Sequence, residues 1–189
     1  MFVNKSIMFG LFTILFFTFI LSKEKPVLIL VSFDGFRYDY TEYVDTPNFD
    51  FLEKNGVKSR SLKPVFPSFT FPNHYSIVTG CYANKHGILG NTFYDVKRKE
   101  FYSYKNSETV QDGSWYGAEP IWVTAQKNSL KTATYFWIGS EAEINGYRPN
   151  IYKNFIPLVN PYEKVDEAMD WLNLPKLERP DLVLLYFDE

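Results

Sequence analysis

The segment VLILVSFDG, residues 27–35, joins a short apolar run directly to an acidic residue and a glycine. Its first seven residues, Val27–Phe33, carry no charge, which predicts a strand buried on both faces of a parallel sheet. The run LVLLYF at Leu182–Phe187 predicts a second buried strand near the other end of the sequence. These two runs indicate an α/β protein if helices lie between them.

Proline-containing start signals and glycine stop signals do lie between the two runs. A proline in the first turn of a helix costs no hydrogen bond, because that N–H has no partner within the helix. The predicted elements are helices over 47–54, 72–79, 121–130 and from 161 to Pro175, and a strand over 132–138. In the last helix, Tyr162, Val165, Met169 and Leu172 recur at helical spacing. The alternation predicts a mostly parallel sheet flanked by helices.

Composition excludes several classes of protein. Hydrophobic residues make up 46% of the 189 residues and charged residues 22%, which excludes a disordered chain and fits about one domain. Lys and Arg number 20 against 22 for Asp and Glu, so no basic excess favours a nucleic-acid partner. The one cysteine, Cys81, and two histidines exclude an internal disulfide framework and a cysteine-rich zinc module.

Residues 1–22 have the pattern of a targeting segment. Lys5 precedes Ile7–Leu21, fifteen residues without a charge, which is the length of a signal-peptide core rather than a full membrane span. Two alternatives remain open, a cleaved signal peptide and an uncleaved signal anchor. Both predict a protein that is secreted or held at the extracellular face of the membrane.

The position of the last predicted strand suggests that the fold is incomplete at the C-terminus. In open α/β sheets, ligand-binding groups lie in the loops that follow the carboxyl ends of strands. Here the strand at Leu182–Phe187 is followed by only two residues. We therefore expect residues 23–189 to form the N-terminal portion of a larger catalytic domain.

Two residues stand where chemistry could occur. Asp34 follows a predicted strand and precedes Gly35, so it could be a metal ligand or simply a turn residue. Thr70 precedes a predicted helix start, where its hydroxyl could be a nucleophile activated by a metal, or an ordinary N-cap. His74 and His86 are expected to be hydrogen-bonded structural histidines rather than ligands.

Five longer motifs carry a family resemblance. They are SFDGFR at 32–37, FPSFTFPNHYSIVTG at 66–80, KHGILGN at 85–91, EPIWVTA at 119–125 and FWIGSEAEING at 136–146. Together they resemble the ectonucleotide pyrophosphatase/phosphodiesterase family of the alkaline-phosphatase-like superfamily. The resemblance covers essentially everything after residue 25, and the block that contains Thr70 is long and specific.

The resemblance implies a site with two zinc ions and a threonine nucleophile. Asp34 matches an aspartate ligand of the zinc that activates the nucleophile. Thr70 matches the nucleophile itself, which also contacts that zinc and is transiently nucleotidylated. Asn91 matches an asparagine that donates a hydrogen bond to a phosphate oxygen. The remaining zinc ligands are expected beyond Glu189, so we expect the isolated 189-residue chain to be inactive.

The same resemblance implies a small-molecule nucleotide substrate. Phe71 matches one wall of a slot for the nucleobase, and Trp137 and Phe155 fall near other aromatic positions of that slot. Two alternatives stay open: hydrolysis of choline lysophospholipids by the same chemistry, and a truncated ectodomain without catalysis. No protein partner is predicted. Ile138 and Asn150 depart from residues common in the family, and no lysine between Tyr102 and Trp115 is matched to a nucleotide-contacting one.

Overall fold

A computed structural model describes residues 26–188, whose centre is a four-stranded parallel sheet. Its strands are β1 (Leu28–Phe33), β6 (Leu182–Phe187), β4 (Thr132–Tyr135) and β5 (Ile151–Lys153), in that spatial order. β6 pairs with β1 in the register Leu28 to Leu182 and with β4 in the register Thr132 to Leu182. The predicted α/β class and the mostly parallel sheet are confirmed.

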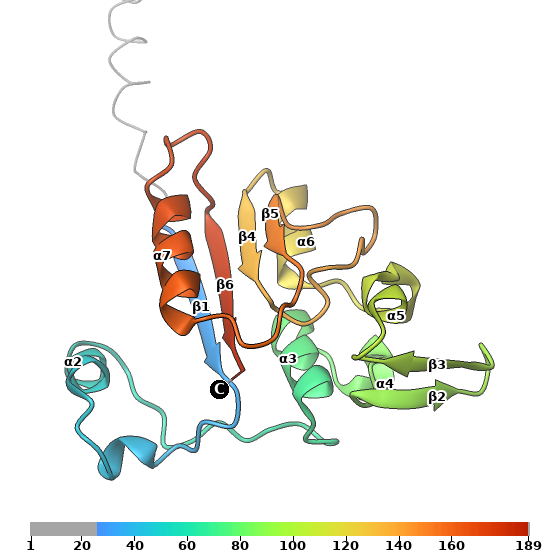
Figure 1. Cartoon of the computed structure of the whole chain (residues 1–189), viewed down its shortest axis with the longest axis horizontal. Coiled ribbons are helices and arrows are strands. Elements are labelled where there is room, and N and C mark those ends of the chain that lie inside the picture. The colour runs from blue at the N-terminus through green and yellow to red at the C-terminus, as the bar shows by residue number, and fades with distance from the viewer. Residues whose placement is uncertain (1–25, 189) are drawn as a thin grey trace, which may run out of the picture.

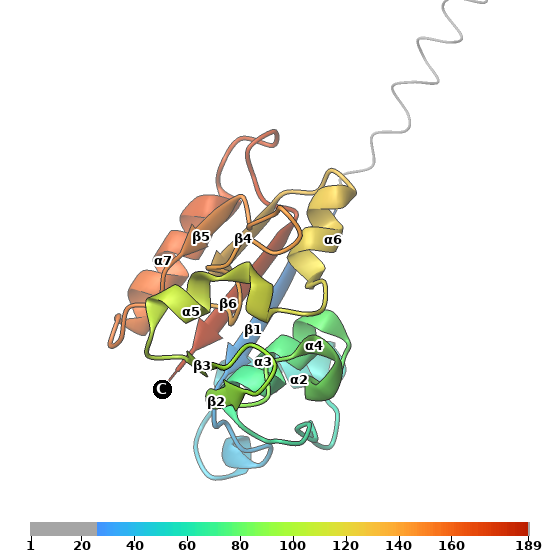
Figure 2. The same ribbon diagram turned by 90° about the vertical axis from the view of Figure 1, so that its right-hand side faces the viewer.

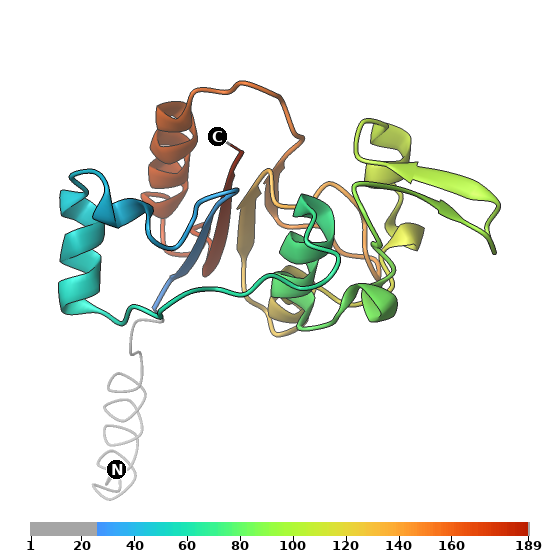
Figure 3. The same cartoon turned by 90° about the horizontal axis from the view of Figure 1, so that it is seen from below.

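Helices cover both faces of this sheet (Figures 1 and 3). One face carries α7 (Pro161–Leu172), and the other carries α3 (Thr70–Thr79) and α6 (Ile121–Lys127). The other elements are η1 (Tyr40–Glu42), α2 (Pro47–Asn55), α4 (Ala83–His86), the antiparallel hairpin β2–β3 (Thr92–Asp95 and Glu100–Ser103), α5 (Ser107–Gln111) and η2 (Gly113–Trp115). In Figure 2, the carboxyl ends of β1 and β6 point toward α3 and the chain terminus.

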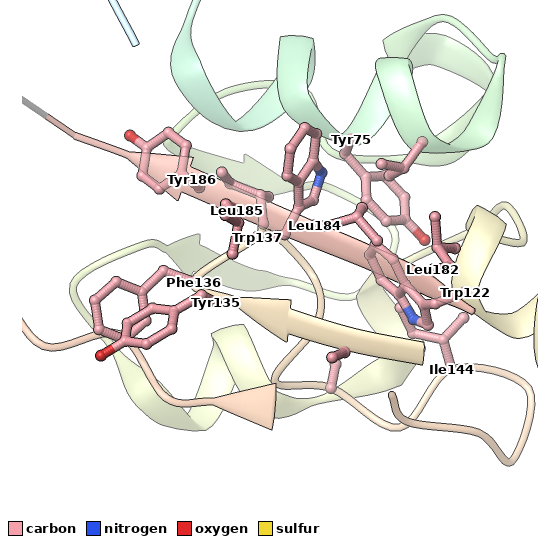
Figure 4. Packing of buried hydrophobic residues seen from close by; sticks show 14 of the residues in the cluster. Tyr75, Trp122, Tyr135, Phe136, Trp137, Ile144, Leu182, Leu184, Leu185 and Tyr186 are labelled. Atoms are coloured by element: carbon pink, nitrogen blue, oxygen red, sulfur yellow. The ribbon is translucent and has the colours of Figure 1, made fainter. Parts of the chain in front are cut away.

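The hydrophobic core is centred on β6, all six residues of which are buried. Figure 4 shows Trp137 and Tyr186 on the α3 side of β6, with Tyr135 and Phe136 on the opposite side. Tyr135 stacks on Trp171 of α7 at 5.8 Å between ring centroids, which joins that helix to the sheet. Burial of such large rings supplies most of the favourable free energy of packing.

The prediction that Val27–Phe33 is buried on both faces is wrong. Leu28 is 58% exposed and Phe33 is 41% exposed, although β6 beside them is fully buried. β1 is an edge strand of the described sheet, with a hydrogen-bonded neighbour on one side only. Helix α2 lies apart from the core, beyond β1, and buries none of its residues (Figures 1 and 3). Apolar composition alone therefore does not distinguish a central strand from an edge strand.

The structure corrects three predicted boundaries. The helix predicted from Pro72 begins two residues earlier, at Thr70, and the strand predicted over 132–138 ends at Tyr135. It ends there because Phe136 has a left-handed backbone, with φ of 62°, which breaks the ladder. The helix predicted over 121–130 ends at Lys127.

In α7 the predicted start is confirmed, because Asn160 caps the helix by accepting a hydrogen bond from the N–H of Tyr162. The apolar series at Tyr162, Val165 and Met169 is exposed, however. The residues that α7 buries are Lys164, Ala168 and Trp171. Lys164 is tolerated there because its ammonium group donates to the Asp188 carboxylate at 2.7 Å.

The predicted targeting segment, residues 1–22, lies outside the described residues. Within residues 26–188, no helix is both long enough and apolar enough to cross a membrane.

Candidate active site

The carboxyl end of β1 places Asp34 at the edge of the sheet. The N–H of Asp34 donates to the carbonyl of Phe187, the last residue of β6, at 2.8 Å, so the pairing with β6 continues one residue past the end of β1. Gly35 then has φ of 69°, a conformation that favours glycine and turns the chain away sharply. The Asp34 carboxylate is thereby fixed at the strand end, half-buried.

The Thr70 hydroxyl meets this carboxylate from the neighbouring helix. Thr70 is the first residue of α3, and its Oγ1 donates to Oδ2 of Asp34 at 3.0 Å. The N-cap interpretation of Thr70 is wrong, because Phe69 occupies the cap position and no side chain caps the helix. The Thr70 hydroxyl is therefore directed at an acidic group near the positive end of a helix dipole.

Tyr186 is a member of this cluster that sequence reasoning missed. Its hydroxyl donates to the same Oδ2 atom of Asp34 at 2.8 Å. Burial, reinforced by that hydrogen bond, raises the pKa of Tyr186, so the phenol keeps its proton at neutral pH. Because Oδ2 accepts both hydrogen bonds, neither occupies the second carboxylate oxygen, Oδ1.

His74 lies one turn below Thr70 and connects the helix to the strand. Its Nδ1 is 2.8 Å from the Thr70 carbonyl, and its Nε2 is 2.8 Å from Oγ of Ser32 in β1. The carbonyl can only accept, so Nδ1 carries the proton and the Ser32 hydroxyl donates to Nε2. Burial lowers the pKa of His74, which favours this neutral form. His74 is thus hydrogen-bonded within the structure, as expected.

Asn91 lies just before β2 and contacts the start of α3. Its Oδ1 accepts the N–H of Phe71 at 3.0 Å, which fixes the orientation of the side-chain amide. The amide NH₂ group is then left as a donor on the other side. An amide donor beside the first turn of α3 is suited to an anionic oxygen.

These groups open onto one cavity of about 540 Å³. Five of the six predicted site residues line it, namely Thr70, Phe71, Asn91, Trp137 and Phe155. The sixth, Asp34, joins them through its hydrogen bonds with Thr70 and Tyr186. Other residues at the wall were not predicted, among them Tyr104, Lys105, Glu141, Tyr186 and Asp188.

The cavity combines a polar end and an aromatic end. The polar end comprises Asp34, Thr70, Asn91 and Tyr186, and the aromatic end comprises Phe71, Trp137 and Phe155. Phe71 packs against Tyr104 with ring centroids 5.8 Å apart, and Phe155 packs edge-to-face on Phe136 at 5.2 Å. Trp137 is fixed by its indole N–H, which donates to the His74 carbonyl at 3.2 Å. Aromatic faces of this kind suit a flat ligand.

The polar end offers two oxygen donors of the kind that bind a divalent cation. Asp34 and Thr70 present a carboxylate and a hydroxyl 3.0 Å apart, and oxygen donors of this type suit a divalent cation. Within residues 26–188, however, no cluster of three or more His, Cys, Asp or Glu side chains could hold a metal ion. Asp34 and Thr70 could thus serve as two ligands of a metal ion, and the described residues do not supply a complete set.

An acid, a hydroxyl and an aromatic cavity at the carboxyl edge of a parallel α/β sheet lie where open α/β sheets bind their ligands. Residues 28–189 match the family model described as type I phosphodiesterase/nucleotide pyrophosphatase. The chain belongs to this family.

Curated relatives agree with this membership. The chain is 47% identical over 169 residues to a venom phosphodiesterase of Naja atra and 45% identical over 171 residues to ectonucleotide pyrophosphatase/phosphodiesterase family member 1 of Homo sapiens. Each alignment covers 88% of this chain, but only 20% and 18% of the respective relative. The chain thus spans about a fifth of the length of the curated relatives that it matches.

Solved structures give the same fold. Murine ectonucleotide pyrophosphatase/phosphodiesterase 5 superposes with a TM-score of 0.80 at 32% identity, over 86% of this chain and 43% of that one. An inactive threonine-to-alanine variant of the murine protein, in complex with AMP, superposes with a TM-score of 0.81 over 87% of this chain. These similarities confirm the predicted family and the alkaline-phosphatase-like architecture.

Proposed function

We propose that this chain carries the nucleophile and the substrate slot of an extracellular, zinc-dependent phosphodiesterase that cleaves nucleotide phosphodiester or pyrophosphate bonds to nucleoside monophosphates. The observation that carries the proposal is the hydrogen bond of the Thr70 hydroxyl to Asp34, beside an aromatic cavity. The family membership and the nucleotide-bound murine relative support it further.

Asp34 and Thr70 would hold one of two zinc ions, together with ligands outside the described residues. Bound zinc would lower the pKa of the hydroxyl that contacts it and offset negative charge on the phosphate group. Tyr186 would keep the Asp34 carboxylate in place, and Asn91 would donate its free amide N–H to a phosphate oxygen.

The reaction would proceed in two displacements at phosphorus. Thr70 Oγ1 attacks the phosphorus atom, a new P–O bond forms, and the bond to the leaving oxygen breaks, giving a nucleotidylated threonine. Water then attacks the same phosphorus atom, releases the nucleoside monophosphate and returns the hydroxyl to Thr70. The proton of the Thr70 hydroxyl passes to the leaving alcohol or phosphate, and in the second step one water proton returns to Thr70 Oγ1.

The aromatic end would bind the nucleobase. Phe71 is part of the helix that bears the nucleophile, so a base stacked on Phe71 has its 5′-phosphate near Thr70. Stacking on an aromatic side chain contributes about 1–3 kcal/mol per base. This lining favours a nucleotide over a choline lysophospholipid, because the base offers a flat ring to stack and an acyl chain does not.

The protein expressed from its complete coding sequence tests this function. We expect it to release 4-nitrophenolate from the 4-nitrophenyl ester of thymidine 5′-phosphate, to lose activity on chelation, and to regain it with zinc. Lysophosphatidylcholine should be hydrolysed far more slowly. A zinc-free protein that hydrolyses neither substrate would instead support a non-catalytic ectodomain, and faster lysophospholipid hydrolysis would support the other alternative.

We also propose that the chain is exported, with residues 1–22 as a leader and residues 23–189 as part of the catalytic domain. The uncharged run Ile7–Leu21 supports this, as do the relatives named venom phosphodiesterases. Detection of the protein in the medium or at the surface of expressing cells, with N-terminal sequencing, would test the assignment and show whether cleavage follows Ser22.

A further inference from the structure

Two loops reach the aromatic end from the carboxyl ends of neighbouring strands. The loop after β4 carries Trp137 and Glu141, and the loop after β5 carries Phe155. Gly139 in the first loop has φ of 87°, and a Cβ there would lie 2.9 Å from the Tyr75 ring, so the loop packs closely on the core. The second loop has no such support, since residues 154–158 are all exposed.

The Glu141 carboxylate joins these loops. Its Oε1 accepts the backbone N–H of Phe155 at 2.9 Å, and its Oε2 accepts the side-chain amide of Gln111 at 3.3 Å. Gln111 is the last residue of α5. One half-buried carboxylate therefore connects the well-packed loop after β4, the end of α5 and the exposed loop after β5.

Phe155 needs such a connection because its ring is 45% exposed and packs mainly on Phe136. An exposed aromatic side chain on a loop must be ordered before it can stack on a ligand, and that ordering reduces affinity. A charge-assisted hydrogen bond to its backbone holds the ring ready at the cavity wall. Glu141 itself need not touch the ligand for this effect.

We propose that Glu141 is a positioning residue that fixes Phe155 at the aromatic end and thereby sets the affinity for substrates that carry a nucleobase. The inference rests on the proposed phosphodiesterase function. It adds a separate prediction: substitution of Glu141 should affect substrates that carry a nucleobase and leave those without one unaffected. The ordering that is lost without the carboxylate corresponds to roughly 3- to 10-fold in KM.

Two esters with the same leaving group separate the role of Glu141 from the chemistry. The 4-nitrophenyl ester of thymidine 5′-phosphate carries a base, whereas methyl 4-nitrophenyl phosphate does not. For the protein expressed from its complete coding sequence, E141A should raise KM for the nucleotide ester roughly 3- to 10-fold with kcat nearly unchanged. The kcat/KM for the methyl ester should change less than about 2-fold, because that ester does not reach Phe155.

Three further variants sharpen the test. E141Q keeps an acceptor oxygen for the Phe155 N–H and should restore KM to within about 2-fold of the parent. E141D keeps the charge but withdraws the oxygens, so it should raise KM in the same direction with the fold preserved. Glu143, an exposed residue of the same loop, is the matched control, and E143A should leave the kinetic constants for both esters unchanged.

A double-variant cycle provides the most specific readout. If Glu141 acts through Phe155, then E141A should add nothing to the KM already raised by F155A. Additive effects, an unchanged KM in E141D, or an equal rise for both esters would overturn the inference. Absence of activity on either ester in the parent protein would instead refute the proposed function, so the two failures are distinct.

Discussion

The polar end and the aromatic end of the cavity are built in different ways. At the polar end, Asp34 lies at the end of a strand, Thr70 starts a helix, and Tyr186 lies within the central strand, with hydrogen bonds of 2.8–3.0 Å among them. At the aromatic end, Trp137 and Phe155 lie on loops after β4 and β5, and Phe155 is 45% exposed. Asp34, Thr70 and Tyr186 therefore rest on regular elements or their ends, whereas two of the three aromatic-end residues rest on loops and Phe71 lies on α3.

This difference teaches where each kind of substitution should act. A group held by strand and helix ends has little freedom to adjust, so its loss should reduce the rate of the chemical step. Side chains on loops can adjust their positions, so removing one of them should weaken substrate binding and leave the rate of the chemical step nearly unchanged. Substitutions at Thr70, Tyr186 and Phe71 test this division in order of decreasing effect, and a smaller effect on stability is expected outside the cavity.

The largest effect is expected for Thr70→Ala, which removes the proposed nucleophile. We expect kcat for the nucleotide ester to fall at least about 10³-fold, because no other hydroxyl occupies that position. Steady-state kinetics on the protein from its complete coding sequence measure this. Thr70→Ser is the matched control, since it keeps a hydroxyl, and it should retain far more activity than the alanine variant.

Tyr186→Phe should have the next largest effect, through the Asp34 carboxylate. Loss of the phenol hydroxyl frees Oδ2 from one of its two hydrogen bonds, and removal of such supporting contacts lowers metal affinity about 10- to 100-fold. Zinc competition with a chromogenic chelator measures the affinity directly. Tyr104→Phe, at an exposed tyrosine of the cavity wall, is the control. Unchanged zinc affinity in Tyr186→Phe would contradict the role assigned to this hydroxyl.

Phe71→Ala tests the aromatic end. We expect KM for the nucleotide ester to rise about 10-fold, because a stacked base loses at least 1 kcal/mol of contact. For methyl 4-nitrophenyl phosphate, kcat/KM should stay within about 3-fold of the parent value. Phe71→Leu fills part of the same volume without a ring and separates stacking from packing. An equal loss for both esters would show that the aromatic end also shapes the chemistry.

The smallest effect concerns stability at a site outside the cavity. Nδ1 of His86 accepts the N–H of Ile88 at 3.2 Å, and its Nε2 is 2.9 Å from Ser76 Oγ, so the buried ring is neutral. Burial lowers the pKa of His86 below 6.5 in the folded state. The unfolded chain then binds the proton more readily, and stability falls as the pH drops below about 6.5.

Chemical denaturation between pH 5 and 8 checks this prediction. The contribution of His86 to the slope should be at most about 1.4 kcal/mol per pH unit, so the slope should diminish by up to that amount in His86→Gln, which cannot be protonated. All other titrating groups remain in the glutamine variant, so the difference between the two slopes reports His86 alone. An identical pH dependence in parent and variant would show that His86 does not contribute.

At the polar end, the residues alone marked Asp34 after an apolar run and Thr70 near a predicted helix start but left a turn and an N-cap role open, and the family resemblance decided between the roles. Both signals are local, and local chemistry fixes strand ends and helix starts. Tyr186 was not predictable, because inside an apolar run nothing indicates that one hydroxyl turns toward an acid 152 positions away. The exposure of β1 was missed for a similar reason, as it depends on which strands pair.

The aromatic end was predictable only through family resemblance. Lys105 reaches the cavity wall although the sequence offered no match for a nucleotide-contacting lysine, because loop geometry and not spacing brings it there. Asn150, a departure from the family pattern, lies outside that wall, where its Oδ1 accepts the N–H of Thr132 at 2.9 Å. Asn150 therefore stabilises the start of β4. Since it does not line the cavity, its departure from the family pattern does not indicate a different substrate.

The central claim is that Thr70 becomes covalently nucleotidylated, and acid-quenched mass spectrometry tests it most directly. The protein from its complete coding sequence is mixed with the nucleotide ester, quenched within milliseconds and digested. The account predicts a nucleoside monophosphate adduct on the peptide that contains Thr70, and no adduct in Thr70→Ala. Turnover that continues in Thr70→Ala at the parent rate, with the Thr70 peptide always unmodified, would contradict it.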